Sequence, residues 1–110
     1  MANSNRVQSN KLVSEVKAIA DLYFYSLEVI KKRQQLLRDS EQDVDEYISY
    51  VVRVRAAFHT LKHVEQIFIN NEFFYEAYPD WWRDLYKESA YYRIRKNSMK
   101  HFKEAVENAY

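Results

Sequence analysis

The chain has 110 residues and a formal net charge of +1, which favours a single domain spanning residues 1–110. It has no cysteine, so disulfide bonds, thiolate metal ligands and cysteine nucleophiles are excluded. Glycine is also absent and proline occurs once, which disfavours β-hairpins and glycine-rich phosphate-binding loops. The composition therefore predicts an all-α fold, a compact bundle of about five helices joined by short connections.

Membrane and export signals are missing from the sequence. The start, "MANSNRVQSN", lacks the apolar core of a signal peptide. No apolar run approaches the roughly 20 residues that span a bilayer. We therefore expect a cytoplasmic protein with no membrane partner.

The first half of the chain predicts two long helices after a polar, frayed start at residues 1–9. Apolar residues in steps of three and four predict a helix over 11–37 and a second over 44–60. The first stripe comprises Leu12, Val16, Ile19, Tyr23, Leu27, Ile30 and Leu37, and the second Val44, Tyr47, Ile48, Val51, Val54, Phe58 and Leu61. Between them, Ser40 and Asp43 resemble a helix-capping box. We expect residues 10–60 to form a scaffold or an interaction surface.

The second half, residues 61–110, predicts three shorter helices. A third helix starts near Lys62, after a weak break, and ends before "AYPD". "DWWRDLY" predicts a short helix of about two turns, in which Trp82 and Leu85 face the core and Trp81 lies at its edge or at a partner surface. Ser89 is the expected N-cap of a final helix over 90–108.

The final helix has a polar face that is rich in cations. Residues 87–103 carry a local excess of five positive charges. Helical spacing predicts that the inward residues are Tyr91, Ile94, Ser98, Phe102 and Ala105, the outward ones Tyr92, Arg93, Lys96 and Lys100, with Arg95 and Lys103 on the flanks. A short helix, a turn and a longer basic helix are typical of a DNA-binding helix-turn-helix. A basic helix face that merely contacts solvent is the alternative.

The histidines offer little support for catalysis. His59 and His63 are four residues apart, a spacing that on one helix face can bind a metal ion. The glutamate of a metalloprotease motif would fall at Thr60 and is absent. We interpret the pair as two surface histidines, and no Ser/His/Asp arrangement has a local signature. We expect no enzymatic activity, no cofactor and no metal site.

The segment "LYKESAYYRIRKNSMKHFKEAV" resembles the C-terminal helix-turn-helix of sigma factor region 4. It resembles more closely the small phage and low-GC bacterial regulators related to the autolysin regulatory proteins. Their recognition helices commonly read as a serine-rich turn, Thr-Tyr-Tyr-Arg, Leu, paired basic residues and Phe, and here Ser89 to Phe102 follow that order. Upstream, "LKHVEQIFINNEFF" is similar to an earlier region 4 helix at Leu61 and Glu65. The resemblance covers about residues 61–106.

The resemblance implies which residues contact DNA and which support the motif. It implies DNA contacts from Lys87, Glu88, Ala90, Tyr92, Arg93 and Lys96. It implies supporting roles for Trp82, Leu85, Tyr91, Ile94, Ser98 and Phe102. The chain departs from the family at Leu85, where glycine is common, which predicts a longer or differently shaped turn. With the other cations of the basic face, the expected DNA-binding set is Lys87, Glu88, Ala90, Tyr92, Arg93, Arg95, Lys96, Lys100 and Lys103.

Two functions follow as expectations. The first is a transcriptional regulator that binds double-stranded DNA with its final helix in the major groove. The second is a helical module that binds another protein, for example RNA polymerase or a regulatory protein, without contacting DNA. In either case the two N-terminal helices could form a homodimer surface.

Overall fold

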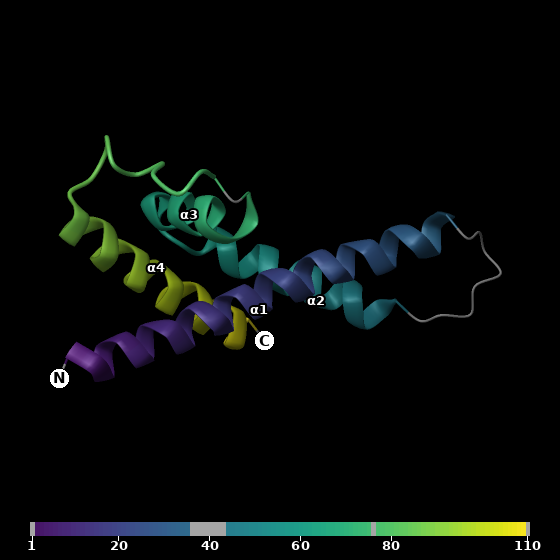
Figure 1. Cartoon of the computed structure of the whole chain (residues 1–110). Coiled ribbons are helices and arrows are strands. Elements are labelled where there is room, and N and C mark those ends of the chain that lie inside the picture. Colours follow the sequence, from purple (N-terminus) through teal and green to yellow (C-terminus); the bar gives the residue numbers. More distant parts are fainter. Residues whose placement is uncertain (1, 36–43, 76, 110) are drawn as a thin grey trace.

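Helices and turns make up the chain in residues 2–35, 44–75 and 77–109, the part that the computed structural model describes (Figure 1). The elements are α1 (Ala2–Gln35), α2 (Asp45–His59), α3 (His63–Ile69), a π-helical turn η1 (Asn70–Phe74) and α4 (Glu88–Glu107). These residues contain no strand, so the all-α prediction is confirmed. The capping box expected at Ser40 and Asp43 lies outside the described residues.

The long helix α1 pairs with α2 as an antiparallel hairpin, and the shorter α4 lies across its N-terminal half (Figure 1). α1 has 34 residues and begins at Ala2, so it includes the segment for which we expected a frayed start. Val16 on its apolar stripe is buried, as the helical spacing predicts, and Ala20, which lies outside the predicted stripe, is buried as well. In the described part of the chain, no helix combines the length and apolar character that crossing a membrane requires.

The main core lies where all four α-helices meet. Its buried residues are Val16 of α1, Val54 and Ala57 of α2, Leu61, Ile69 of α3, and Met99, Phe102 and Val106 of α4. Phe102 is 0% exposed and its ring packs edge-on against Phe74, with centroids 5.9 Å apart. Burying a large apolar side chain stabilises a fold by about 1.5–3 kcal/mol, so this core is the main source of stability.

A second, aromatic core lies between α3, the connection over residues 77–87 and the start of α4. Phe68, Trp82 and Tyr91 are buried there, with Trp81 and Tyr86 packed against them. The indole of Trp82 stacks on the Tyr91 ring, with centroids 4.0 Å apart and planes 11° apart. This core holds an irregular connection against two helices.

The predicted short helix "DWWRDLY" is wrong, because residues 79–85 form consecutive turns. Main-chain N–H groups of Arg83 and Leu85 donate to the carbonyls three residues earlier, at 3.1 and 2.9 Å. Side chains of adjacent helical residues point about 100° apart, whereas Trp81 and Trp82 both pack on the aromatic core. Leu85 is 68% exposed, so its expected role in the core is wrong as well.

Side chains close the glycine-free turn between α2 and α3. Thr60 donates its hydroxyl to the Ala57 carbonyl at 2.6 Å. The Gln66 amide donates to the carbonyls of Phe58 and Leu61 at 3.2 and 3.3 Å. Unpaired carbonyls at a helix end need such donors, and a residue with positive φ is one common alternative. Residues 63–74 form the expected third helix, with Lys62 at its N-cap and a π-helical end.

Charged side chains connect α4 to its neighbours. Glu65 accepts a hydrogen bond from the Lys62 main-chain N–H at 3.1 Å, and its other oxygen pairs with His101 of α4. Arg53 of α2 donates to the last carbonyls of α4, those of Val106 and Glu107. A cation at the negative end of the helix dipole is favourable. α4 starts at Glu88, two residues before the predicted start, with Lys87 rather than Ser89 at the N-cap position.

Replacing Phe102 by Ala should lower the free energy of unfolding by about 3–5 kcal/mol, because the truncation leaves a cavity where four helices meet. Urea unfolding followed by circular dichroism measures the change. Val52, 59% exposed on α2, provides the control, and Val52→Ala should change stability by less than about 0.5 kcal/mol. Equal losses in the two variants would contradict the position of the core.

Candidate nucleic-acid interface

One face of α4 is exposed along its first three turns and carries Tyr92, Arg93, Lys96 and Lys100. The opposite face is buried and carries the apolar residues of both cores. The division between Tyr91, which is 6% exposed, and Tyr92, which is 55% exposed, agrees with the helical spacing. Ser98 is fully buried, and its hydroxyl donates to the Ile94 carbonyl at 2.7 Å, so it adds no unpaired polar group.

The cations of this face have no acidic partner within the part of the chain that the structure describes. No ion pair joins Arg93, Lys96 or Lys100 to any carboxylate of the described residues. Their charges are therefore available to an external anion. We call Tyr92, Arg93, Lys96 and Lys100 the outer face of α4.

The two flanking cations are used inside the protein. The Arg95 side chain is 22% exposed, and its Nε lies 3.6 Å from Oε2 of Glu72 in η1. Lys103 pairs with Glu15 of α1 and with Glu107, and the hydrogen bond to Glu15 raises the pKa of Lys103. Both residues therefore connect α4 to neighbouring elements, and they point away from the outer face.

The remaining members of the expected set lie at the start of α4. Lys87 and Glu88 are exposed, and Ala90 is half-buried. The structure thus brings six of the nine expected residues to one end and one side of α4: Lys87, Glu88, Tyr92, Arg93, Lys96 and Lys100.

Aromatic rings hold the base of the outer face. Tyr92 packs edge-on against Tyr91, with centroids 5.0 Å apart, and tilted against Trp82 at 6.5 Å. The Arg83 guanidinium covers the Trp82 ring, 5.1 Å from its centroid. Trp82 therefore contacts Tyr91, Tyr92 and Arg83, so the irregular connection is fixed to the first turn of α4.

Glu72 is the residue that sequence reasoning missed. Its carboxylate accepts hydrogen bonds from the Trp81 indole N–H at 3.3 Å and from the Tyr91 hydroxyl, and it lies beside Arg95. One carboxylate thus joins η1, the connection and α4. Burial, and then the hydrogen bond to Glu72, raise the pKa of the Tyr91 hydroxyl well above its usual value. The sequence contained a pattern that could have indicated Glu72. The indole and the phenol of a core need hydrogen-bond acceptors, and "NNEFF" contains an acid between apolar runs.

The histidine pair does not share a helix face. His59 ends α2 and His63 begins α3, with the turn of Thr60 between them, and both are exposed. Across the described residues, no group of three or more His, Cys, Asp or Glu side chains could hold a metal ion.

Comparisons with protein-family models, with curated proteins and with solved structures find no match for this chain. The resemblance to sigma factor region 4 therefore rests on the residues of 61–106 alone.

Replacing Tyr91 by Phe should make the free energy of unfolding less dependent on pH in the alkaline range. The pKa of Tyr91 is raised above the 10.0 of the unfolded chain, so above about pH 10 the unfolded chain loses this proton first. The hydroxyl therefore contributes its full stabilisation of the fold below about pH 10 and a smaller one above it. The stability advantage of the wild type over Tyr91→Phe should shrink by about 1 kcal/mol between pH 8 and pH 11. Urea unfolding at each pH measures it.

The exposed neighbour supplies the control for this comparison. Tyr92→Phe should show no such change with pH, because Tyr92 is 55% exposed. A constant difference between the wild type and Tyr91→Phe would contradict the buried hydrogen bond to Glu72.

Proposed function

We propose that the protein is a DNA-binding transcriptional regulator of the region 4-like, helix-turn-helix type, with α4 as the recognition helix. The observation that carries the proposal is the outer face of α4, a row of exposed cations and one Tyr with no acidic partner among the described residues. Cations that a fold leaves unpaired on a rigid helix are suited to phosphate binding.

The proposed contacts follow the geometry of a helix in the major groove. The N-terminal turns of a recognition helix reach base edges, and residues further along contact the backbone. Arg93 would read a guanine through its planar guanidinium, and Tyr92 would contact a phosphate or a base edge. Lys96, Lys100 and Lys87 would neutralise phosphates. Arg95 and Lys103 would act indirectly, by holding α4 in position.

The support behind α4 fits this proposal. A recognition helix needs a second element that fixes its angle, and α3 packs against α4. Here the connection between them is a run of turns held by Trp81, Trp82 and Glu72. α1 and α2 would serve as a scaffold or as a homodimer surface. A regulator of this type would act in the cytoplasm.

Binding to duplex DNA tests the proposal. We expect fluorescence anisotropy with a labelled duplex to detect binding at low salt that weakens steeply as salt rises, because bound counterions are released. The double variant Arg93→Ala/Lys96→Ala should weaken binding and reduce the slope of log K against log salt by about 1–2.

A charge-matched control uses cations far from α4. Lys31 and Lys32 are exposed near the C-terminal end of α1, which extends away from α4 (Figure 1). Lys31→Ala/Lys32→Ala removes the same charge and should leave the affinity nearly unchanged. Absence of binding at low salt, or equal losses in both double variants, would exclude α4 as the DNA-binding element.

A second candidate function rests on exposed apolar residues of the helical hairpin. Leu22 and Tyr25 of α1 are 44% and 57% exposed, and Ile48 and Val52 of α2 are 42% and 59% exposed. Exposed apolar side chains in one region are typical of protein interaction sites. A module of this kind would bind RNA polymerase or another regulatory protein.

The two candidates respond to different variants. If the hairpin binds RNA polymerase, the immobilised protein should retain purified bacterial RNA polymerase, and Leu22→Asp/Tyr25→Asp should abolish that retention because two charges would be buried in the interface. Arg93→Ala/Lys96→Ala should not affect it. Retention that depends on Arg93 and Lys96 instead would point to α4 as the protein-binding surface.

A further inference from the structure

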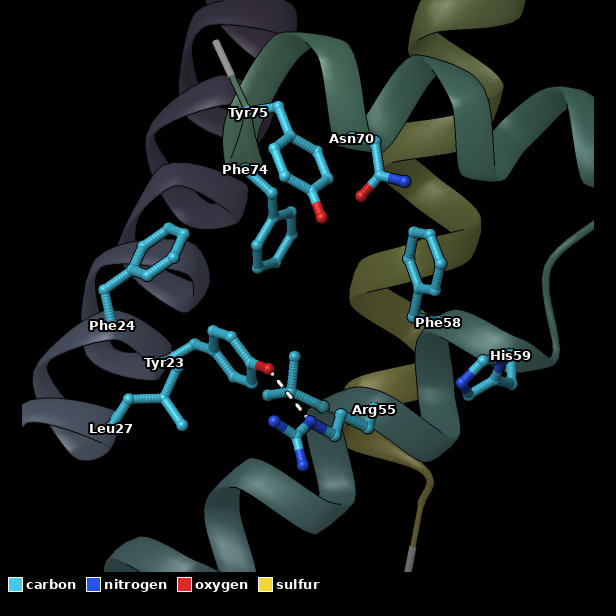
Figure 2. Close-up of a pocket in the computed structure, with 10 residues that line it drawn as sticks. Tyr23, Phe24, Leu27, Arg55, Phe58, His59, Asn70, Phe74 and Tyr75 are labelled. Atoms are coloured by element: carbon cyan, nitrogen blue, oxygen red, sulfur yellow. Dashed lines mark hydrogen bonds between the residues drawn. The ribbon is translucent and has the colours of Figure 1, made fainter. Parts of the chain in front are cut away.

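A cavity of about 340 Å³ lies between α1, α2 and the π-helical turn, on elements other than α4 (Figure 2). Aromatic side chains from three elements form its walls: Tyr23 and Phe24 of α1, Phe58 of α2 and Phe74 of η1. Three of these rings are closely packed. The centroid of the Phe74 ring lies 5.5 Å from that of Tyr23 and 5.7 Å from that of Phe24. Small-molecule sites commonly have volumes of about 300–1,000 Å³ and apolar walls.

The rim of the cavity leaves aromatic surface in contact with water. Phe24 is 42% exposed, and Tyr75, which also lines the cavity (Figure 2), is 79% exposed. Binding of an apolar ligand over these two rings would be favourable, because it would remove apolar surface of both rings from water.

The polar side chains that line the cavity, among the described residues, are neutral or cationic. Arg55, His59 and Asn70 contribute to this lining, and no described Asp or Glu does. The Nε of Arg55 donates to the Tyr23 hydroxyl at 3.0 Å, as Figure 2 shows. This bond leaves the two terminal nitrogens of the guanidinium, and no carboxylate of the described residues pairs with them. A guanidinium with two free nitrogens is suited to a carboxylate.

The π-helical turn shapes one wall. The Tyr75 N–H donates to the Asn70 carbonyl at 2.7 Å, five residues earlier, and this wide turn places Asn70, Phe74 and Tyr75 along the cavity. π-helical turns occur often at functional sites. The cavity therefore combines an unusual backbone, exposed rings and a cation with no carboxylate partner among the described residues.

From these observations we infer that the cavity binds a small aromatic carboxylate with one or two rings. The carboxylate pairs with Arg55, and the ring lies against Tyr23, Phe58 and Phe74. The volume, at the low end for small-molecule sites, limits the ligand to this size. The inference does not depend on whether α4 binds DNA.

The test compares two probes of equal shape, 2-naphthoate and the neutral 2-naphthalenemethanol, by isothermal titration calorimetry. We expect saturable binding of 2-naphthoate with one site per chain and at least tenfold weaker binding of the alcohol. Arg55→Gln should weaken 2-naphthoate about tenfold and leave the alcohol unchanged. Phe24→Ser should weaken both probes.

Control variants separate the cavity from general charge and from unfolding. Lys32→Gln removes an exposed cation of α1 that does not line the cavity, and it should leave binding of both probes unchanged. Each variant should keep the circular dichroism spectrum of the wild type; if Arg55→Gln does not, Arg55→Lys replaces it and should retain part of the preference for 2-naphthoate. No binding at millimolar probe, or equal affinity for both probes in the wild type, would overturn the inference.

Discussion

The carboxylate of Glu72 is the interaction on which the arrangement of the C-terminal half depends. It accepts hydrogen bonds from the Trp81 indole N–H and the Tyr91 hydroxyl and lies beside Arg95, so it links η1, the connection over residues 77–87 and α4. Glu72 is partly buried, and removing it would leave the Trp81 and Tyr91 donors without this acceptor, which costs more than the hydrogen bonds themselves contribute. A residue outside α4 therefore helps to fix the position of α4 and, with it, the direction of the outer face.

Because the chain has no glycine, side chains stabilise the helix ends and the turns. Thr60 and Gln66 bond the last carbonyls of α2, and Arg53 bonds those of α4. The connection before α4 is shaped by stacked aromatic rings around Trp82. Each of these helix ends and turns depends on a particular side chain. A glycine at such a position would act only through its backbone, which can adopt positive φ.

Helical periodicity predicted most of the fold. Apolar spacing placed α1, α2, the 62–74 segment and α4, and it assigned Tyr91 inward and Tyr92 outward, because periodicity depends only on neighbours along one helix. It could not predict the turns of 79–85, where both Trp side chains pack on partners distant in sequence. Periodicity also placed Arg95 and Lys103 on the flanks of the basic face. It could not predict their acidic partners, Glu72 and Glu15, because these lie on other elements.

The fold constrains the number of residues in the π-helical turn. Its hydrogen bond spans five residues where that of an α-helix spans four, and each residue of an α-helix turns the following side chains by about 100°. Glu72 contacts Tyr91 of α4, while Phe74 packs between Tyr23 of α1 and Phe102 of α4. Deleting a single residue from Asn70–Phe74 would rotate one of these two side chains out of its contact, even if every remaining residue were kept. Homologous chains that share this architecture should therefore vary in sequence within the segment more freely than in length.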